Sequence, residues 1–180
     1  MKIKKLAHCC LFIETNGLKI LTDPGIYSLE GHDSIGALDI ILITHEHEDH
    51  FHINSVKALI ARIPNVKIIA NDAVGEILSQ HGIVHHVMKD GQEFVHKDLI
   101  IQARGKLHAR IHSTIPQISN VGFIIKSDKS IFIPGDAFTK IDESIDILAL
   151  PVSGSWMKIE EAIDYAIEMN PKAAFPIHDS

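Results

Sequence analysis

Thr44-His-Glu-His-Glu-Asp-His50 is the stretch of sequence that decides the fold. It follows directly on Asp39–Thr44, a continuous apolar run with β-branched residues, which predicts a strand buried on both faces of a sheet. His45 and His47 are two residues apart, so an extended exit from this strand points both imidazoles to one side. Asp49 and the third histidine follow as the chain turns toward the next helix. The pattern therefore predicts a metal-binding loop at the end of a buried strand.

Four ligands in one loop are more than a single catalytic zinc uses, namely three protein ligands and a water. A two-metal site is therefore the natural interpretation, with further ligands supplied from elsewhere in the chain. Neutral imidazoles combined with a carboxylate accept Zn²⁺, Mn²⁺, Fe²⁺ or Ni²⁺. The competing interpretation is a solvated polar turn that is merely rich in histidine, and it suits a lone His-x-His better than this denser pattern.

Short apolar runs alternate with helical patterns along the rest of the chain. Asn16-Gly17 predicts a hairpin turn, and Asn71 is a predicted N-cap. A helix that begins at Ser155 or Lys158 ends before Pro171. Its apolar stripe, predicted to face the core, consists of Ile159, Ala162, Ile163, Ala166 and Ile167. Further strands are predicted over residues 3–6, 11–15, 18–21, 66–70, 84–88, 99–103, 121–126, 130–133, 146–150 and 173–177, and helices over 53–61 and from 72 to about 82.

Composition bounds the remaining possibilities. The chain has 180 residues, 46% of them apolar and 22% charged, which predicts one globular domain over residues 1–180. The net charge of −6 argues against a nucleic-acid binder that relies on neutralising phosphates. No apolar run approaches the ~18 residues that a membrane helix needs. The two cysteines, Cys9 and Cys10, are adjacent, which excludes a disulfide framework and indicates a reducing compartment, the cytoplasm.

The metal loop also resembles a known family. His45–His50 is similar to the metal-binding motif of the metallo-β-lactamase superfamily. Three more pieces match that superfamily in the same order: Leu-Thr-Asp-Pro at 21–24, Pro-Gly-Asp-Ala at 134–137 and Phe-Pro-Ile-His-Asp at 175–179. The resemblance covers essentially the whole chain, and it implies an α/β (α+β) fold, a four-layer αββα sandwich with the site at one edge.

The resemblance also implies a dinuclear centre, usually of zinc. Carried onto this sequence, the first metal is bound by His45, His47 and one middle histidine, the second by Asp49, His50 and His178, and Asp136 bridges the two. The middle histidine is either His108 or His112, and the distance from the preceding predicted strand favours His108. The one left over would contact substrate or act in proton transfer. Asp49 and His112 are therefore the candidate catalytic side chains.

Three more side chains are candidates for the surroundings of the metals. Asp23, which precedes Pro24, is either a turn residue or a partner that orients a ligand. His8 is interpreted as lining the pocket. Trp156 is either packed in the core or an apolar wall of the substrate pocket. The other histidines, interpreted as surface residues, are His32, His81, His85, His86 and His96, while His52 is interpreted as exposed or near the ligands.

Within the superfamily, the N-terminal piece made of Leu-Ala-His at 6–8 and Ile-Glu-Thr-Asn-Gly-Leu-Lys-Ile-Leu-Thr-Asp-Pro at 13–24 resembles a branch of ascorbate-6-phosphate-lactonase-like and N-acylphosphatidylethanolamine-phospholipase-D-like hydrolases. This predicts a metal-dependent hydrolase of a small ester, lactone or phosphate-containing substrate. Two alternatives stay open: a phosphodiesterase or ribonuclease, and a metal-binding regulatory module without turnover. A homo-oligomer is one expectation, because members of such folds often pair. Related chains usually continue for a few tens of residues beyond the counterpart of His178, so closing elements are expected to be missing here.

Overall fold

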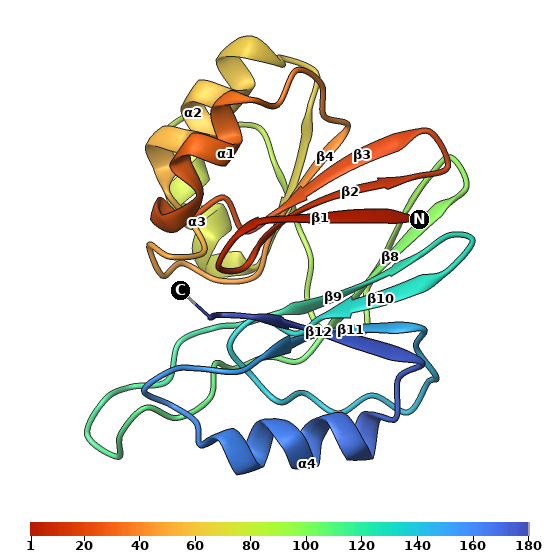
Figure 1. Ribbon diagram of the computed structural model, residues 1–180. Helices are drawn as coiled ribbons and strands as arrows, with labels where there is room; N and C mark the ends of the chain where they lie inside the picture. The colour runs from red at the N-terminus through yellow and green to blue at the C-terminus, as the bar shows by residue number, and fades with distance from the viewer. Residues whose placement is uncertain (180) are drawn as a thin grey trace. The chain divides into compact units, whose positions relative to one another are not determined.

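The chain forms two six-stranded sheets, one in each half of the sequence. The computed structural model describes residues 1–179, which divide into two units, residues 1–88 and residues 89–179. In Figure 1 the first unit runs from red through yellow to light green, and the second from green to blue.

The sheet of the first unit follows the chain in the order β1-β2-β3-β4-β5-β6. Its first three strands are antiparallel, and β3 to β6 are parallel. Asn16 and Gly17 join β2 to β3 with φ angles of 48° and 73°, the positive values that a primed hairpin turn requires, so the predicted hairpin is confirmed. The strands are β1 Lys2–Ala7, β2 Cys10–Thr15, β3 Leu18–Thr22, β4 Ile40–Ile43, β5 Lys67–Ala70 and β6 His86–Val87.

The helices of the first unit lie against one face of its sheet (Figure 1). They are the 3-10 helix η1 Ile26–Ser28 and the α-helices α1 Leu29–Asp33, α2 Ile53–Arg62 and α3 Asp72–Gln80. Asn71 caps α3 as predicted, because its Oδ1 accepts a hydrogen bond from the backbone N–H of Val74 at 2.9 Å. All four residues of β4 are buried, as expected of a strand that is covered on both faces.

The sheet of the second unit has the order β12-β11-β10-β9-β8-β7. Strands β7 to β10 are antiparallel, whereas β10, β11 and β12 run parallel. The strands are β7 Glu93–His96, β8 Leu99–Arg104, β9 Gly122–Lys126, β10 Ser130–Ile133, β11 Ile147–Pro151 and β12 Ala173–Ile177. The helix α4, Ile159–Met169, lies along one face of this sheet (Figure 1).

The prediction of which residues of α4 face the core is largely wrong. Ile159, Ile163 and Ile167 are 60%, 53% and 71% exposed, whereas Tyr165 and Met169 are buried and pack on the apolar core of the sheet. The five predicted positions cover a wide arc, and the helix is rotated so that Ala162, Tyr165, Ala166 and Met169 face the strands. These four positions share the same i, i+3, i+4, i+7 spacing, so periodicity alone cannot choose between the two faces.

The fold class is confirmed as mixed α/β. Each unit supplies one sheet and one helical layer, which are the components of the metallo-β-lactamase type. Three short elements were not predicted: the half-exposed edge strand β7, the 3-10 helix η1 and the helix α1. Among residues 1–179, no helix is both long and apolar enough to cross a membrane. The single domain over 1–180 stays a prediction.

Candidate metal centre

The loop between β4 and α2 holds the four donors of the predicted metal-binding motif. It turns tightly, because the backbone N–H groups of His50 and Phe51 both donate to the carbonyl of His47, at 2.9 and 2.7 Å. Gly25 allows the loop after β3 to pack on it, since a Cβ at that position would lie 1.8 Å from the carbonyl oxygen of Asp49. The loop is therefore held from its own turn and from the neighbouring strand end.

His45 contacts two other imidazoles of this loop, His47 at a centroid distance of 4.8 Å and His50 at 4.1 Å. His45 Nε2 lies 3.1 Å from His47 Nδ1, and His45 is fully buried. The neighbouring Thr44 hydroxyl donates to Asp23 at 2.9 Å, so its oxygen is available to accept from His45 Nδ1 at 3.0 Å. This places the proton of His45 on Nδ1 and directs the lone pair of Nε2 toward His47.

Asp23, which is fully buried, holds the loop through hydrogen bonds from Thr44 and His50. It follows β3 with a φ of 42°, and its carboxylate accepts from the backbone N–H of Thr44 at 2.8 Å, from the Thr44 hydroxyl and from His50 Nδ1 at 2.9 Å. A carboxylate that accepts from one ring nitrogen of histidine fixes the ring and makes the other nitrogen a better ligand. Asp23 therefore orients His50, which is one of the two roles expected for it.

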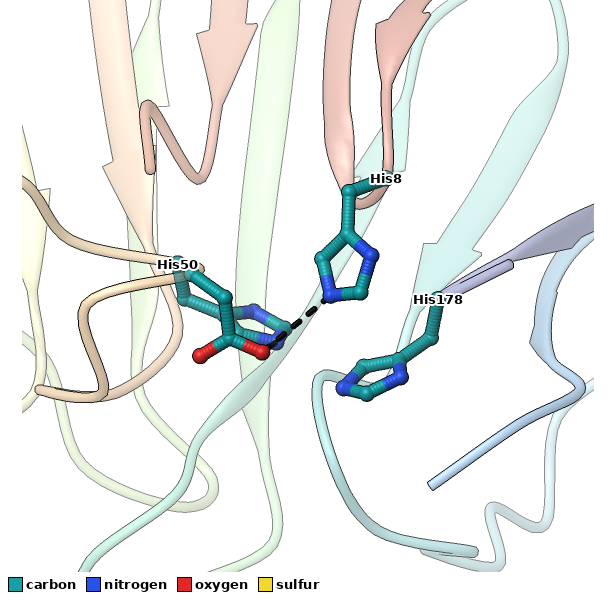
Figure 2. Close-up of side chains that lie close together, drawn as sticks. His8, His50 and His178 are labelled. Atoms are coloured by element: carbon teal, nitrogen blue, oxygen red, sulfur yellow. Dashed lines mark hydrogen bonds and ion pairs between the residues drawn. The ribbon is translucent and has the colours of Figure 1, made fainter. Parts of the chain in front are cut away.

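His8 lies against Asp49, in the turn between β1 and β2. Its Nε2 is 3.1 Å from Asp49 Oδ2, the contact drawn as a dashed line in Figure 2, and its φ of 49° places it in the left-handed region. The His8 ring also contacts Tyr27 at a centroid distance of 5.0 Å and His50 at 5.8 Å. Ligand atoms of His8, Asp49 and His50 lie within 4.8 Å of one another. His8 thus lies beside the donors of this loop, and its role in lining a pocket stays a prediction.

A second donor group forms in the other unit, at the ends of strands that run in one direction. Asp136 follows β10, His178 follows β12, and His108 follows β8. Asp136 Oδ2 lies 3.3 Å from His108 Nε2 and 3.0 Å from His178 Nε2. His108 Nδ1 donates to the carbonyl of Ala109 at 2.6 Å, and since a carbonyl can only accept, Nε2 keeps its lone pair.

His108 and His112 differ clearly in their surroundings. His108 is 2% exposed and lies beside Asp136, whereas His112 is exposed and its Nδ1 contacts the Thr114 hydroxyl at 2.8 Å. Of the two middle histidines, the structure therefore brings His108 to Asp136.

Two residues near Asp136 were missed or only partly recognised from the sequence. Asn120, fully buried, accepts from the backbone N–H of Asp136 at 3.1 Å and donates to the carbonyl of Pro134 at 2.9 Å. Trp156, interpreted as core or as pocket wall, donates its indole N–H to Asp136 Oδ2 at 2.9 Å. Neither contact has a sequence signal, because the partners lie 16 and 20 residues apart on separate elements.

His32 was interpreted as a surface residue, and this is wrong. It is 3% exposed, its Nε2 lies 2.7 Å from Ser28 Oγ and 3.6 Å from Cys10 Sγ, and its carbonyl accepts from Arg62 at 2.8 Å. Burial raises the pKa of the Cys10 thiol far above its ordinary value, so this cysteine is not a reactive thiolate. Cys9 is also buried.

The donor sets fit divalent metal ions. Zn–N bonds of ~2.0–2.1 Å in tetrahedral geometry place two ligand atoms of one ion about 3.3 Å apart. The contacts of 3.1 Å between His45 and His47, and of 3.3 and 3.0 Å at Asp136, match this spacing. Buried imidazoles that are oriented through their second nitrogen, as in His50 and His108, are typical of metal ligands.

The chain is similar to several known proteins. Residues 2–178 match the family described as Beta-lactamase superfamily domain. The chain is 34% identical to protein Rv0786c of Mycobacterium tuberculosis, over 100% of this chain and 84% of the relative. It is 32% identical to the UPF0173 protein PF0020 of Pyrococcus furiosus, over 99% of this chain and 83% of that protein.

A solved structure from Parabacteroides distasonis, described as a candidate metal-dependent hydrolase, superposes with a TM-score of 0.80 at 27% identity, covering 99% of this chain and 83% of the other. An isothiocyanate hydrolase from Delia radicum gut bacteria has a TM-score of 0.75 at 17% identity, over 99% of this chain and 85% of that one, which is a likeness of fold alone.

Proposed function

The chain belongs to the metallo-β-lactamase superfamily, and on this premise we propose that it is a metal-dependent hydrolase with a dinuclear centre. The observation that carries the proposal is the donor chemistry: each unit gathers buried imidazoles and carboxylates at strand ends, with ligand atoms 3.0–3.3 Å apart. Relatives described as UPF0173 metal-dependent hydrolases, such as one of 29% identity from Nanoarchaeum equitans, support the reaction class.

The proposed ligand assignment follows the order of the family's motifs. We assign one ion to His45, His47 and His108, the other to Asp49, His50 and His178, and the bridging position to Asp136. Zinc is the metal we expect first, because imidazole-rich sites with carboxylates suit it, and Mn²⁺, Fe²⁺ and Ni²⁺ are the alternatives. When bound, such ions act as Lewis acids and bring the pKa of a bound water to about neutral.

The protein's own side chains have defined tasks in this proposal. Asp49 orients the nucleophile and accepts its proton, and the contact between its Oδ2 and His8 Nε2 at 3.1 Å holds the carboxylate in place. Asp23 holds His50 through Nδ1, and Thr44 holds His45 in the same way. Both imidazoles therefore keep Nε2 for a metal ion. His112, exposed in the loop that carries His108, is the proposed proton donor to the leaving oxygen.

The proposed substrate is a small molecule with an ester, lactone or phosphate-containing bond, in keeping with the lactonase-like branch that the N-terminal motif resembles. Hydrolysis of any of these needs the same two elements, an activated water and stabilisation of the oxyanion that forms at the attacked centre.

The test is metal content followed by turnover. The purified protein is stripped with a chelator, reloaded with Zn²⁺, Mn²⁺, Fe²⁺ or Ni²⁺ separately, and analysed by mass spectrometry of the metals. Each form is then assayed on a p-nitrophenyl ester, a lactone, a phosphodiester and a phosphomonoester. We expect two metal equivalents per chain and hydrolysis of at least one substrate.

Variants identify the ligands. His47→Ala and Asp136→Ala should lose metal and activity together, whereas His81→Ala, an exposed histidine outside both donor groups, should keep both. Full metal content in either ligand variant would refute the assignment. Two metals per chain without turnover on any of the four substrates would refute the hydrolase and support a metal-binding regulatory module.

A further inference from the structure

Trp156 makes a contact that the proposed chemistry does not use. It follows β11 by five residues, and its Nε1–H donates to Asp136 Oδ2 at 2.9 Å. The same oxygen lies 3.3 Å from His108 Nε2 and 3.0 Å from His178 Nε2. One carboxylate oxygen therefore faces the two histidines of this donor group and the indole at once.

The indole also contacts both histidines of the group. Its ring lies edge-on to His108 at a centroid distance of 5.9 Å and to His178 at 6.1 Å, with interplanar angles of 76° and 84°. Trp156 thus touches all three donor residues of the second unit. A buried indole N–H usually finds an acceptor, and here that acceptor is the carboxylate of the donor group itself.

The surrounding residues fix the ring in this place. Phe138 packs edge-on against it at 5.3 Å. Gly154 has a φ of 152°, and a Cβ there would lie 2.7 Å from Trp156 Nε1 and 3.1 Å from its Cδ1. A glycine two residues upstream is therefore what leaves room for the indole N–H to reach Asp136.

We propose that Trp156 is a positioning residue, which holds the carboxylate of Asp136 in its metal-binding orientation through the indole N–H. This rests on the proposed function, because it assigns a role toward the same metals. An indole is a neutral donor without an acceptor, so it orients the carboxylate but leaves its negative charge for the ion, unlike a lysine or arginine at the same place. Partners of this kind typically change metal affinity or activity 10- to 100-fold.

The first test is Trp156→Phe, which removes the N–H and keeps most of the aromatic surface. Zn²⁺ affinity is measured by competition with a chromophoric chelator, and Co²⁺ loading by its visible absorption bands. We expect metal binding to weaken 10- to 100-fold, and kcat to fall while KM changes little. Tyr165→Phe is the matched control, because it removes a polar group from another aromatic of the same unit and should leave metal binding unchanged.

The second test leaves the tryptophan in place. Gly154→Ala should push the indole away from Asp136 and weaken metal binding in the same direction, whereas Gly36→Ala, where the added Cβ meets nothing within 4 Å, should have no effect. Because the chain has one tryptophan, its single indole N–H signal in a ¹H–¹⁵N spectrum reports on this contact alone. We expect the signal to be protected from solvent exchange in the wild type, to shift on addition of Zn²⁺, and to lose protection in Gly154→Ala.

The outcomes separate this inference from the proposed function. If the wild type binds no metal, both fail. If the wild type binds metal and Trp156→Phe and Gly154→Ala bind it within twofold as tightly, only the role of Trp156 is refuted. The same conclusion follows if Trp156→Phe raises KM for bulky substrates alone, since that is the behaviour of a pocket wall.

Discussion

The two units use the same arrangement of three parallel strands, β3-β4-β5 in the first and β10-β11-β12 in the second. In each, an aspartate just before the central strand ties the amino ends of its neighbours. In the first unit Asp39 accepts from the backbone N–H of Lys19 at 2.8 Å, and its carbonyl accepts from Lys67 at 2.9 Å. In the second unit Asp146 accepts from Ser130 at 2.8 Å, and its carbonyl accepts from Ala173 at 2.9 Å.

The units differ in how the candidate metal donors are arranged at the carboxyl ends of these strands. In the first unit four donors lie within one loop after β4, supported by Asp23 after β3 and by His8. In the second unit the donors are single residues after three different strands, namely His108, Asp136 and His178. Trp156 follows a fourth strand, β11. The first group therefore depends on one turn and its anchor, whereas the second depends on correct pairing of the sheet.

The largest effect in this comparison is expected for the anchor of the first group. Asp23→Ala removes the acceptor of three buried hydrogen bonds, two from Thr44 and one from His50. The free energy of unfolding should fall by about 3–5 kcal/mol, because buried donors are left without an acceptor. Urea denaturation measures this, and Zn²⁺ affinity should fall with it.

Asp23→Asn is the control for that prediction, since it keeps the shape of the side chain and one acceptor oxygen. It should cost less than Asp23→Ala. A loss below about 1 kcal/mol in the alanine variant would show that the loop holds its turn without the anchor, and the contrast between the units would be wrong.

A smaller effect is expected for the corresponding anchor of the second group. Asn120→Ala removes two buried hydrogen bonds, to the backbone of Pro134 and of Asp136, and should cost about 2–3 kcal/mol. Urea denaturation gives the value, and the fluorescence of Trp156 should change because Asp136 moves. Asn120→Asp keeps the acceptor for the N–H of Asp136 but replaces the donor to Pro134 by a second acceptor, so its fluorescence should change less than that of Asn120→Ala while stability still falls. An unchanged emission spectrum in Asn120→Ala would show that the strands alone place Asp136.

The same contrast explains what could be predicted from the sequence. The first group was predictable because its signals are local: an apolar run for β4, and donors one or two residues apart directly after it. The hairpin at Asn16 and the cap at Asn71 are local in the same sense, and both were confirmed. Asp136 and His178 were indicated by their resemblance to family motifs rather than by spacing.

What could not be predicted depends on packing between distant segments. His32 is buried because Ser28 and Cys10 meet it, and no pattern in the sequence records that contact. The contact of Trp156 with Asp136 joins the ends of two strands, so it exists only when the sheet is formed. The predicted orientation of α4 was wrong because two faces of the helix share one apolar period, and the sheet packs against the face with Tyr165 and Met169.

The smallest effect concerns acid stability and the aspartate before β11. Hydrogen bonds from Lys172 and from the backbone and side chain of Ser130 lower the pKa of Asp146 from 3.8 to about 2. Because the pKa is lower in the folded state, the ionised carboxylate stabilises the fold above about pH 4, and this contribution is lost as the pH falls toward 2. Asp146→Asn should therefore flatten the decline of the unfolding free energy between pH 4 and 2, measured by urea denaturation at each pH.

Lys172→Met should give an intermediate profile, because it removes the largest cause of the shift and keeps the bonds from Ser130. Asp146 ties the amino ends of the strands whose other ends carry Asp136, Trp156 and His178, so its loss acts on the frame and not on the donors themselves. Zn²⁺ affinity at neutral pH should accordingly stay within a few-fold of the wild type in both variants. An affinity loss of about 10-fold or more would mean that the hydrogen bonds of Asp146 at the amino ends of the strands set the donor positions, and that sheet pairing at the carboxyl ends is not sufficient to hold them.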